Sequence, residues 1–193
     1  MDHSARVGRR FTGADGYSTL EILMTVGIMG VLMSMALLQI GQTLPSIKGD
    51  GAMRVVIAQV NQAREMAIAQ RRNMQLTFTS GNKVEVIREN WPGPTLTVLR
   101  SVYLESGAAF NLVSGIPDTP EAFGNSSAVY FGTATTIKFG TDGMLLDQSG
   151  NPINGSVFVS LGQQARSFRA VTILGSTGRV RGYRWDGRAW KLV

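Results

Sequence analysis

An uncharged run of seventeen residues, from Ile22 to Leu38, constrains this chain more than any other feature. A helix of that length is about 26 Å long, which is close to the roughly 30 Å apolar core of a lipid bilayer. We therefore predict one membrane-spanning helix, with residues 17–40 as the transmembrane segment. Glu21 stands at the edge of the run. Because a carboxylate in a membrane is costly, Glu21 is a candidate functional residue that needs a partner.

The residues around Glu21 resemble the class III signal of type IV pilins and pseudopilins. Gly16 is followed by the aromatic Tyr17, and Glu21 is the fifth residue after that glycine. The resemblance implies that a prepilin peptidase cuts between Gly16 and Tyr17, and that Tyr17 is then N-methylated. It also implies that Glu21 pairs with the N-terminal ammonium of a neighbouring subunit during assembly.

Two other interpretations of the apolar run remain open. An ordinary secretory signal peptide needs a small-residue cleavage site after the run, and residues 34–36 (Ser-Met-Ala) are a candidate for it. A glutamate at the start of the run is atypical of such a peptide. The second alternative is a plain single-pass membrane anchor. The pilin-type signal is preferred, because the glycine, the aromatic residue, the glutamate and the apolar run all fall at the offsets of that family.

The charges that flank the span predict its orientation. Three arginines lie in residues 1–16, the expected cytoplasmic leader, and no comparable basic cluster follows the span before residues 71–72. Basic residues favour the cytoplasmic side of a membrane. We expect a single-pass protein with a cytoplasmic N-terminus, and the resemblance to pilins and pseudopilins implies that it lies in the cell inner membrane. Residues 41–193 would then form one periplasmic globular domain.

The composition excludes several classes of catalytic site. The chain has 193 residues, of which 177 remain if the leader is removed, and it contains no cysteine. Its one histidine is His3, inside the leader. The mature chain would therefore lack common zinc sites, Cys–His nucleophiles and Ser-His-Asp triads. Its acidic residues are few and scattered, so we predict no catalytic residue, no metal, no cofactor and no enzyme activity.

The segment that follows the span contains several residues that disfavour a helix. Pro45, Gly49 and Gly51 predict a kink or a loosening of the helix over residues 41–51, with Asp50 as the cap of a renewed helix. Residues 52–70 then place apolar side chains in one stripe at helical spacing. That pattern is typical of an amphipathic helix packed against a sheet.

The hydrophobic period changes to two after Arg72, which predicts an antiparallel sheet within residues 73–193. A turn at residues 80–82 joins two alternating runs and indicates a hairpin over residues 74–88. Residues 107–127 are rich in Gly, Pro, Ser and Asn and are interpreted as a mobile surface loop. Residues 96–99 and 101–104 predict another strand or a pair of strands. Further strands are predicted at 128–131, 136–139, 144–146, 157–161, 170–174, 178–185 and 190–192.

The order of the last strands resembles the GspH/FimT group of pseudopilins and minor pilins. A strand at 137–139, a turn at Asp142-Gly143, strands at 157–161 and 169–174, and the run Gly178-Arg179-Val180-Arg181 carry this resemblance. It implies an α+β pilin-like fold, whose long N-terminal helix spans the membrane and packs on an antiparallel sheet. It implies a role in a short inner-membrane filament for type II protein secretion or type IV pilus biogenesis. The implied partners are other pseudopilins or minor pilins, an inner-membrane assembly platform and the lipid bilayer.

The C-terminal segment is strongly basic. Residues 163–193 hold seven basic side chains and one acidic one, a balance of +6 that equals the net charge of the whole chain. Arginines with aromatic neighbours can hold phosphates and stack on bases, and the Gly-Arg-x-Arg run resembles one that FimT-like minor pilins use to bind DNA during natural transformation. DNA binding is thus an alternative function, and contacts with partner subunits or anionic headgroups would explain the same residues. The candidate DNA-binding residues are Arg179, Arg181, Arg184, Trp185 and Trp190.

Overall fold

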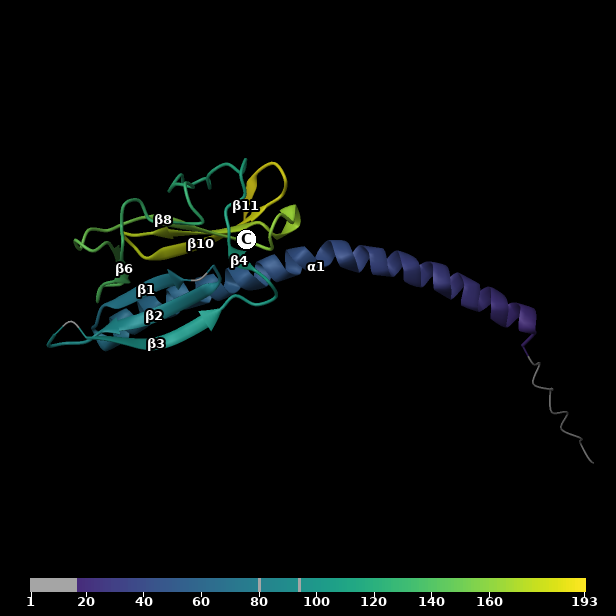
Figure 1. Ribbon diagram of the computed structural model, residues 1–193, viewed down its shortest axis with the longest axis horizontal. Coiled ribbons are helices and arrows are strands. Elements are labelled where there is room, and N and C mark those ends of the chain that lie inside the picture. The colour runs from purple at the N-terminus through teal and green to yellow at the C-terminus, as the bar shows by residue number, and fades with distance from the viewer. Residues whose placement is uncertain (1–16, 80, 94) are drawn as a thin grey trace, which may run out of the picture. The chain divides into compact units, whose positions relative to one another are not determined.

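The computed structural model describes residues 17–79, 81–93 and 95–193 (Figure 1). The chain divides into two compact units, of which the first ends at Ile40 and the second comprises Gly41–Val193. Helix α1 (Thr19–Gln70) begins in the first unit and ends in the second. The described residues of the second unit form eleven strands, so the class is α+β with an N-terminal apolar helix and antiparallel sheets, in agreement with the prediction.

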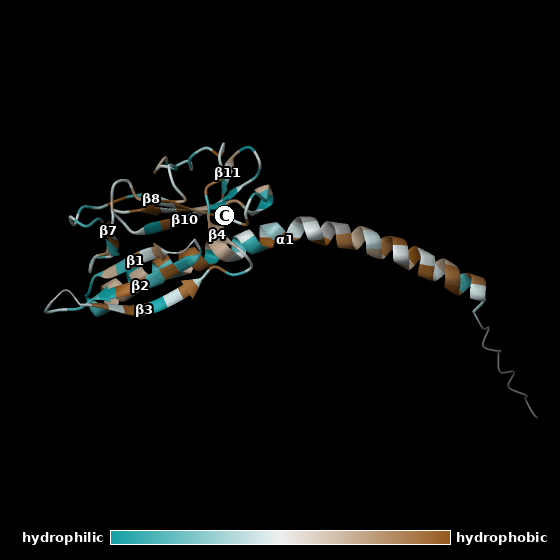
Figure 2. Cartoon of the chain, in the orientation of Figure 1, coloured by the Kyte–Doolittle hydropathy of each residue, from teal (hydrophilic) through white to brown (hydrophobic). Residues whose placement is uncertain are grey.

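The first part of α1 is long and apolar enough to cross a membrane. Residues Thr19–Leu37 have a mean hydropathy of 2.0, and none of this stretch is buried (Figure 2). Two hydroxyls inside it bond to the helix's own backbone. Thr25 Oγ1 donates to the carbonyl of Ile22 at 2.8 Å, and Ser34 Oγ donates to the carbonyl of Gly30 at 2.8 Å. These polar groups therefore need no partner outside the helix.

The kink or loosening predicted over residues 41–51 does not interrupt the helix, because α1 continues through Pro45. Contacts within the second unit explain why this part of the helix contains residues that disfavour a helix. A Cβ atom added at Gly49 would lie 2.6 Å from the carbonyl oxygen of Ser167, so glycine permits a close approach of two backbones. Asp50 caps no new helix, since its carboxylate pairs with Arg169 and Arg184. Tertiary contacts thus override local helix propensity.

The strands form two antiparallel sheets rather than the single one expected. The first has the order β3-β2-β1-β6-β7, and the second has the order β11-β10-β9-β8-β4, with β5 also paired to β8. The chain leaves the first sheet after β7, and β8 in the second sheet pairs with β9, β4 and β5. The bounds are β1 Met74–Thr79, β2 Lys83–Glu89, β3 Leu96–Tyr103, β4 Ala109–Phe110, β5 Val129–Tyr130, β6 Ile137–Phe139, β7 Leu145–Leu146, β8 Gly155–Ser160, β9 Arg169–Leu174, β10 Arg179–Trp185 and β11 Trp190–Leu192.

The predicted hairpin is confirmed. β1 and β2 pair antiparallel with Leu76 opposite Val86 and Phe78 opposite Val84. The two runs predicted over 96–104 form the single strand β3, which pairs with β2 and shifts register between Val86 and Ile87. A bulge of this kind bends a strand without ending it, which explains why the sequence pattern seemed interrupted.

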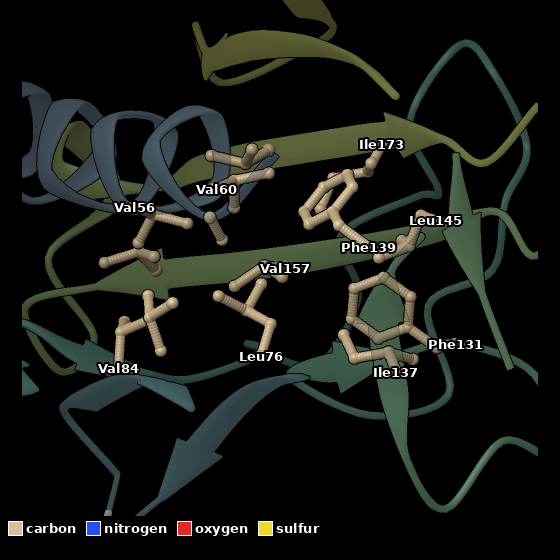
Figure 3. Packing of buried hydrophobic residues seen from close by; sticks show 14 of the residues in the cluster. Val56, Val60, Leu76, Val84, Phe131, Ile137, Phe139, Leu145, Val157 and Ile173 are labelled. Atoms are coloured by element: carbon tan, nitrogen blue, oxygen red, sulfur yellow. The ribbon is translucent and has the colours of Figure 1, made fainter. Parts of the chain in front are cut away.

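One core joins both sheets to the second part of α1. Its helical residues follow the predicted stripe, and Val56, Val60 and Ala63 are fully buried. Figure 3 shows Val56 and Val60 close to side chains of β1, β2, β8 and β9. The amphipathic prediction for residues 52–70 is therefore confirmed. The core residues labelled in the figure are Val56, Val60, Leu76, Val84, Phe131, Ile137, Phe139, Leu145, Val157 and Ile173.

Candidate functional site

The predicted assembly residues lie at the start of α1. Glu21 is in the first turn of the helix, where its negative charge is favoured by the helix dipole. Tyr17 precedes the helix with 78% of its surface exposed. Within the described part of the chain, neither side chain has an ion pair or a hydrogen bond. Gly16, the predicted cleavage residue, lies outside the described residues.

Strand β10 divides the predicted DNA-binding arginines between two faces. Arg179 and Arg181 lie on one face, which we call the outer face, as their alternate positions require. Arg184 lies on the opposite face, toward α1, where its Nη2 is 2.6 Å from Asp50 Oδ2. Gly182 lies on that same inner face, since a Cβ atom there would be 2.9 Å from Met53 Sδ. The structure therefore brings together Arg179 and Arg181 but not Arg184.

A glutamate far away in the sequence contacts the outer-face arginines. Arg181 Nη1 lies 3.2 Å from Glu121 Oε1, and Arg179 Nη2 lies 3.7 Å from the same oxygen. Thr172 Oγ1 on the adjacent strand β9 donates to Glu121 Oε2. A hydrogen bond with Tyr183 and the charge of Glu121 raise the pKa of Arg181. The side chains of Arg179 and Arg181 remain accessible, with 48% and 39% of their surface exposed.

The two tryptophans lie beside this face but contribute to packing. The rings of Trp185 and Trp190 meet edge to face, with centroids 5.3 Å apart. Trp190 Nε1 donates to the carbonyl of Pro117 at 2.9 Å, and its ring packs against Phe158. Both tryptophans are half-buried. Trp190 in particular is fixed by contacts on several sides.

Residues 111–125, which we call the cover segment, lie over the outer face of the second sheet. Asn111 Nδ2 donates to Ser160 Oγ at 2.9 Å, and Glu121 reaches Thr172 and Arg181. Within the segment, Asp118 Oδ2 accepts a hydrogen bond from the backbone N–H of Gly124 at 2.7 Å. The predicted surface loop is thus confirmed for residues 111–125, which contain no helix or strand, and this segment is bonded to the sheet and to itself.

A second cluster of charges, which sequence reasoning missed, joins α1 to β9. The Arg169 side chain is fully buried, and its Nε donates to Asp50 Oδ1 at 2.6 Å. Its Nη2 donates to the carbonyl and hydroxyl of Ser46, and its Nη1 donates to the carbonyls of Arg166 and Phe168. Burial lowers the pKa of Arg169, and the bond to Asp50 counteracts that effect. Every nitrogen of this guanidinium thus has a partner.

The acidic residues of two turns satisfy backbone groups. Asp142 Oδ1 accepts from the N–H of Met144 at 3.0 Å. Asp147 Oδ1 accepts from the N–H groups of Ser149 and Asn151 at 2.8 and 2.9 Å, and the bond from Asn151 contributes most to lowering its pKa. Across residues 17–79, 81–93 and 95–193, no group of three or more His, Cys, Asp or Glu side chains could hold a metal ion.

Two sets of residues thus offer charged groups to a binding partner. Glu21 offers an unpaired carboxylate at the start of α1. The outer face of β10 offers two guanidinium groups, Arg179 and Arg181, next to Glu121. No protein-family model matches this chain, and no curated protein or solved structure is significantly similar to it.

Proposed function

We propose that this protein is a pseudopilin or minor pilin, which inserts into a short inner-membrane filament through the first part of α1. The observation that carries the proposal is the dual character of that helix. Its apolar part is unburied and begins with Glu21, while its amphipathic part supplies one side of the core of an α+β unit. A subunit of this design can exchange lipid contacts for contacts with other helices and keep its folded unit unchanged.

Glu21 sets the position of the subunit in the filament. Outside a filament its carboxylate stays at the edge of the apolar span, where desolvation is expensive. The N-terminal ammonium of a neighbouring subunit offers the opposite charge at the same depth. Pairing is therefore favoured at one axial offset between helices, and this offset is the register of the filament. Secretion of proteins and pilus biogenesis are the two processes that such a filament would serve.

The proposed partners follow from this route to assembly. A prepilin peptidase removes residues 1–16 and leaves Tyr17 as the methylated first residue. The leader arginines keep that end in the cytoplasm, and the unit Gly41–Val193 lies in the periplasm. Other pseudopilins or minor pilins and an inner-membrane assembly platform then receive the mature subunit.

Replacing Gly16 by tryptophan should abolish cleavage, because the peptidase must fit the residue before the cut. The chain would be expressed in membranes with a prepilin peptidase, and its intact mass would be measured. The wild-type chain should lose sixteen residues and carry one methyl group on Tyr17, whereas Gly16→Trp should keep its full length. Gly8→Trp, a matched control within the same leader, should be cut normally. Loss of the same sixteen residues from Gly16→Trp would exclude this type of signal.

DNA binding during natural transformation is a second candidate function. The outer-face pair Arg179 and Arg181 favours it, because both side chains remain more than one third exposed in the most basic part of the chain. Contacts with acidic partner subunits would use the same pair. The placement of Arg184 on the inner face, and the packing of Trp190, restrict the candidate interface to fewer residues than the sequence suggested.

The Arg179→Ala/Arg181→Ala double variant should flatten the salt dependence of duplex binding. Two lost phosphate contacts change the slope of log affinity against log salt by roughly 1.8. The measurement is a salt series with the full chain in nanodiscs of neutral lipid, so that the membrane contributes no charge. The Arg184→Ala variant serves as the control and should keep the wild-type slope. Equal slopes for wild type and double variant would assign the pair to contacts with proteins.

A further inference from the structure

The outer face of the second sheet groups two guanidinium groups and a hydroxyl around one carboxylate. Two guanidinium groups, of Arg179 and Arg181, and the hydroxyl of Thr172 all point toward the same carboxylate. Thr172 lies directly opposite Arg181 in the register of β9 and β10, so the sheet itself fixes this arrangement. The site holds two positive charges and is occupied by the single negative charge of Glu121.

A carboxylate and a phosphodiester bind such a site in the same way. Both accept charge-assisted hydrogen bonds from guanidinium groups through two oxygens. Glu121 therefore occupies the position that a phosphate would take between Arg179 and Arg181. It is also well shielded, with 13% of its side chain exposed, while the arginines that it contacts remain accessible.

We propose that Glu121 is an internal competitor that occupies the space between Arg179 and Arg181, and that one nucleic-acid phosphate binds both arginines together only by displacing it. The proposal rests on the DNA-binding function proposed above and adds its regulation. A phosphate that approached with Glu121 in place would meet a negative charge that is hydrogen-bonded to Arg181 and ion-paired with Arg179. Binding of one phosphate by both arginines therefore requires that the glutamate leave the site.

The backbone around Glu121 favours such a displacement. The next residue, Ala122, has a φ of +53°, a conformation that is unfavourable for a residue with a Cβ atom. Strain of this kind persists only where the surroundings enforce it. Here the enforcing contacts are those of Glu121 with the sheet and the turn bond from the N–H of Ala122 to the carbonyl of Thr119, at 2.9 Å.

The cover segment can stay attached when Glu121 leaves. Pro117 is held by the 2.9 Å hydrogen bond from Trp190, and Asp118 holds Gly124 through its backbone N–H. These contacts flank Glu121 and involve neither Arg179 nor Arg181. Opening of the site is therefore a local movement of the turn at 119–122, and it leaves the packing around Trp190 in place.

The test compares Glu121→Gln with the wild type in duplex DNA binding. Glutamine keeps the shape of the side chain and removes the competing charge. With the full chain in neutral-lipid nanodiscs and a short duplex oligonucleotide as the probe, Glu121→Gln should bind about tenfold more tightly, a gain on the scale of one charge-assisted hydrogen bond. The gain should vanish in the Glu121→Gln/Arg179→Ala/Arg181→Ala variant. Glu105→Gln, which removes an exposed carboxylate elsewhere, is the matched control and should bind like the wild type.

Each other outcome rejects the proposed role of Glu121 as a competitor, and the outcomes can be told apart. Equal, measurable binding by wild type and Glu121→Gln would reject it and leave DNA binding intact. If Glu121→Gln still tightened DNA binding when Arg179 and Arg181 were also replaced, the gain would be a general effect of the lost negative charge on DNA affinity. A gain on anionic vesicles but not on DNA would assign the site to lipid headgroups. Absence of binding by both chains would reject the competitor together with DNA binding, and it would leave the filament function untouched.

Hydrogen exchange gives a second measurement that needs no variant. In the wild-type chain, the amides of Glu121 and Ala122 should exchange faster when saturating duplex is present, because the turn at 119–122 loses the contacts of Glu121. The amides of Gly124, β9 and β10 should keep their protection. Unchanged or slower exchange at Glu121 and Ala122 in the complex would contradict the displacement of Glu121.

Discussion

Replacing Asp50 by alanine should lower the free energy of unfolding of the globular unit by about 3–5 kcal/mol, the usual effect of breaking a buried ion pair. The variant leaves the guanidinium of Arg169 fully buried with no counter-charge. Its hydrogen bonds to three backbone carbonyls and to Ser46 would remain, but they do not neutralise it. Urea unfolding of the full chain in neutral detergent, followed by tryptophan fluorescence, measures the change.

Arg184 provides the matched control for this prediction. Its side chain pairs with the same carboxylate of Asp50 at the same 2.6 Å distance, yet 45% of it is exposed. Exposed pairs contribute about 0–1 kcal/mol, so Arg184→Gln should change stability little. If the free energy of unfolding of Asp50→Ala also lay within about 1 kcal/mol of the wild-type value, the Asp50–Arg169 pair would not be a main contribution to the packing of α1 on β9.

The elements that could be predicted from sequence are those defined by local periodicity. The alternation in residues 74–88 predicts both strands of the hairpin, because a half-buried strand must alternate. The stripe over residues 52–70 predicts the buried face of α1 for the corresponding reason. The shared face of Arg179 and Arg181 follows from the same two-residue period, and the structure confirms it.

The elements that could not be predicted depend on contacts between distant residues. Asp50 and Arg169 are 119 positions apart, and no local pattern shows that Gly49 and Asp50 serve a contact with β9 rather than a helix break. One signal was present, because Arg169 occupies an inward position beside the apolar run Ala170–Leu174. An arginine at such a position requires a buried carboxylate partner. The sequence did not say which of the carboxylates it would be.

The candidate site was incomplete for the same reason. Glu121 lies 60 positions from Arg181, in a segment whose glycines and prolines suggested a loop without a fixed structure. The composition of the cover segment correctly indicated that it has no regular strands over most of its length. The composition did not indicate that the segment packs on the outer face, because hydrogen bonds such as that from Trp190 to Pro117 produce no periodic pattern in the sequence.

Replacing Glu21 by alanine should leave cleavage intact and remove the protein from filaments. The variant keeps Gly16 and Tyr17, so an unchanged mature mass is expected. It lacks the carboxylate that pairs with a neighbour's ammonium. Close charge pairs at interfaces contribute about 1.5 kcal/mol or more, which corresponds to a loss of at least about tenfold in the association constant of the subunit. Sheared filaments and membranes, collected from cells that also produce the other subunits, are compared by immunoblot.

Two further variants separate charge from polarity in this experiment. Glu21→Gln keeps the size and hydrogen-bonding capacity of the side chain, yet it should fail to assemble as Glu21→Ala does, because the ammonium needs a negative partner. Thr25→Ala removes a hydroxyl one turn later that bonds only to its own helix, and it should assemble normally. Normal assembly of Glu21→Gln would restrict the role of Glu21 to hydrogen bonding. Normal assembly of Glu21→Ala would remove this residue from the mechanism, and the register of the subunit would then have to come from packing between helices alone.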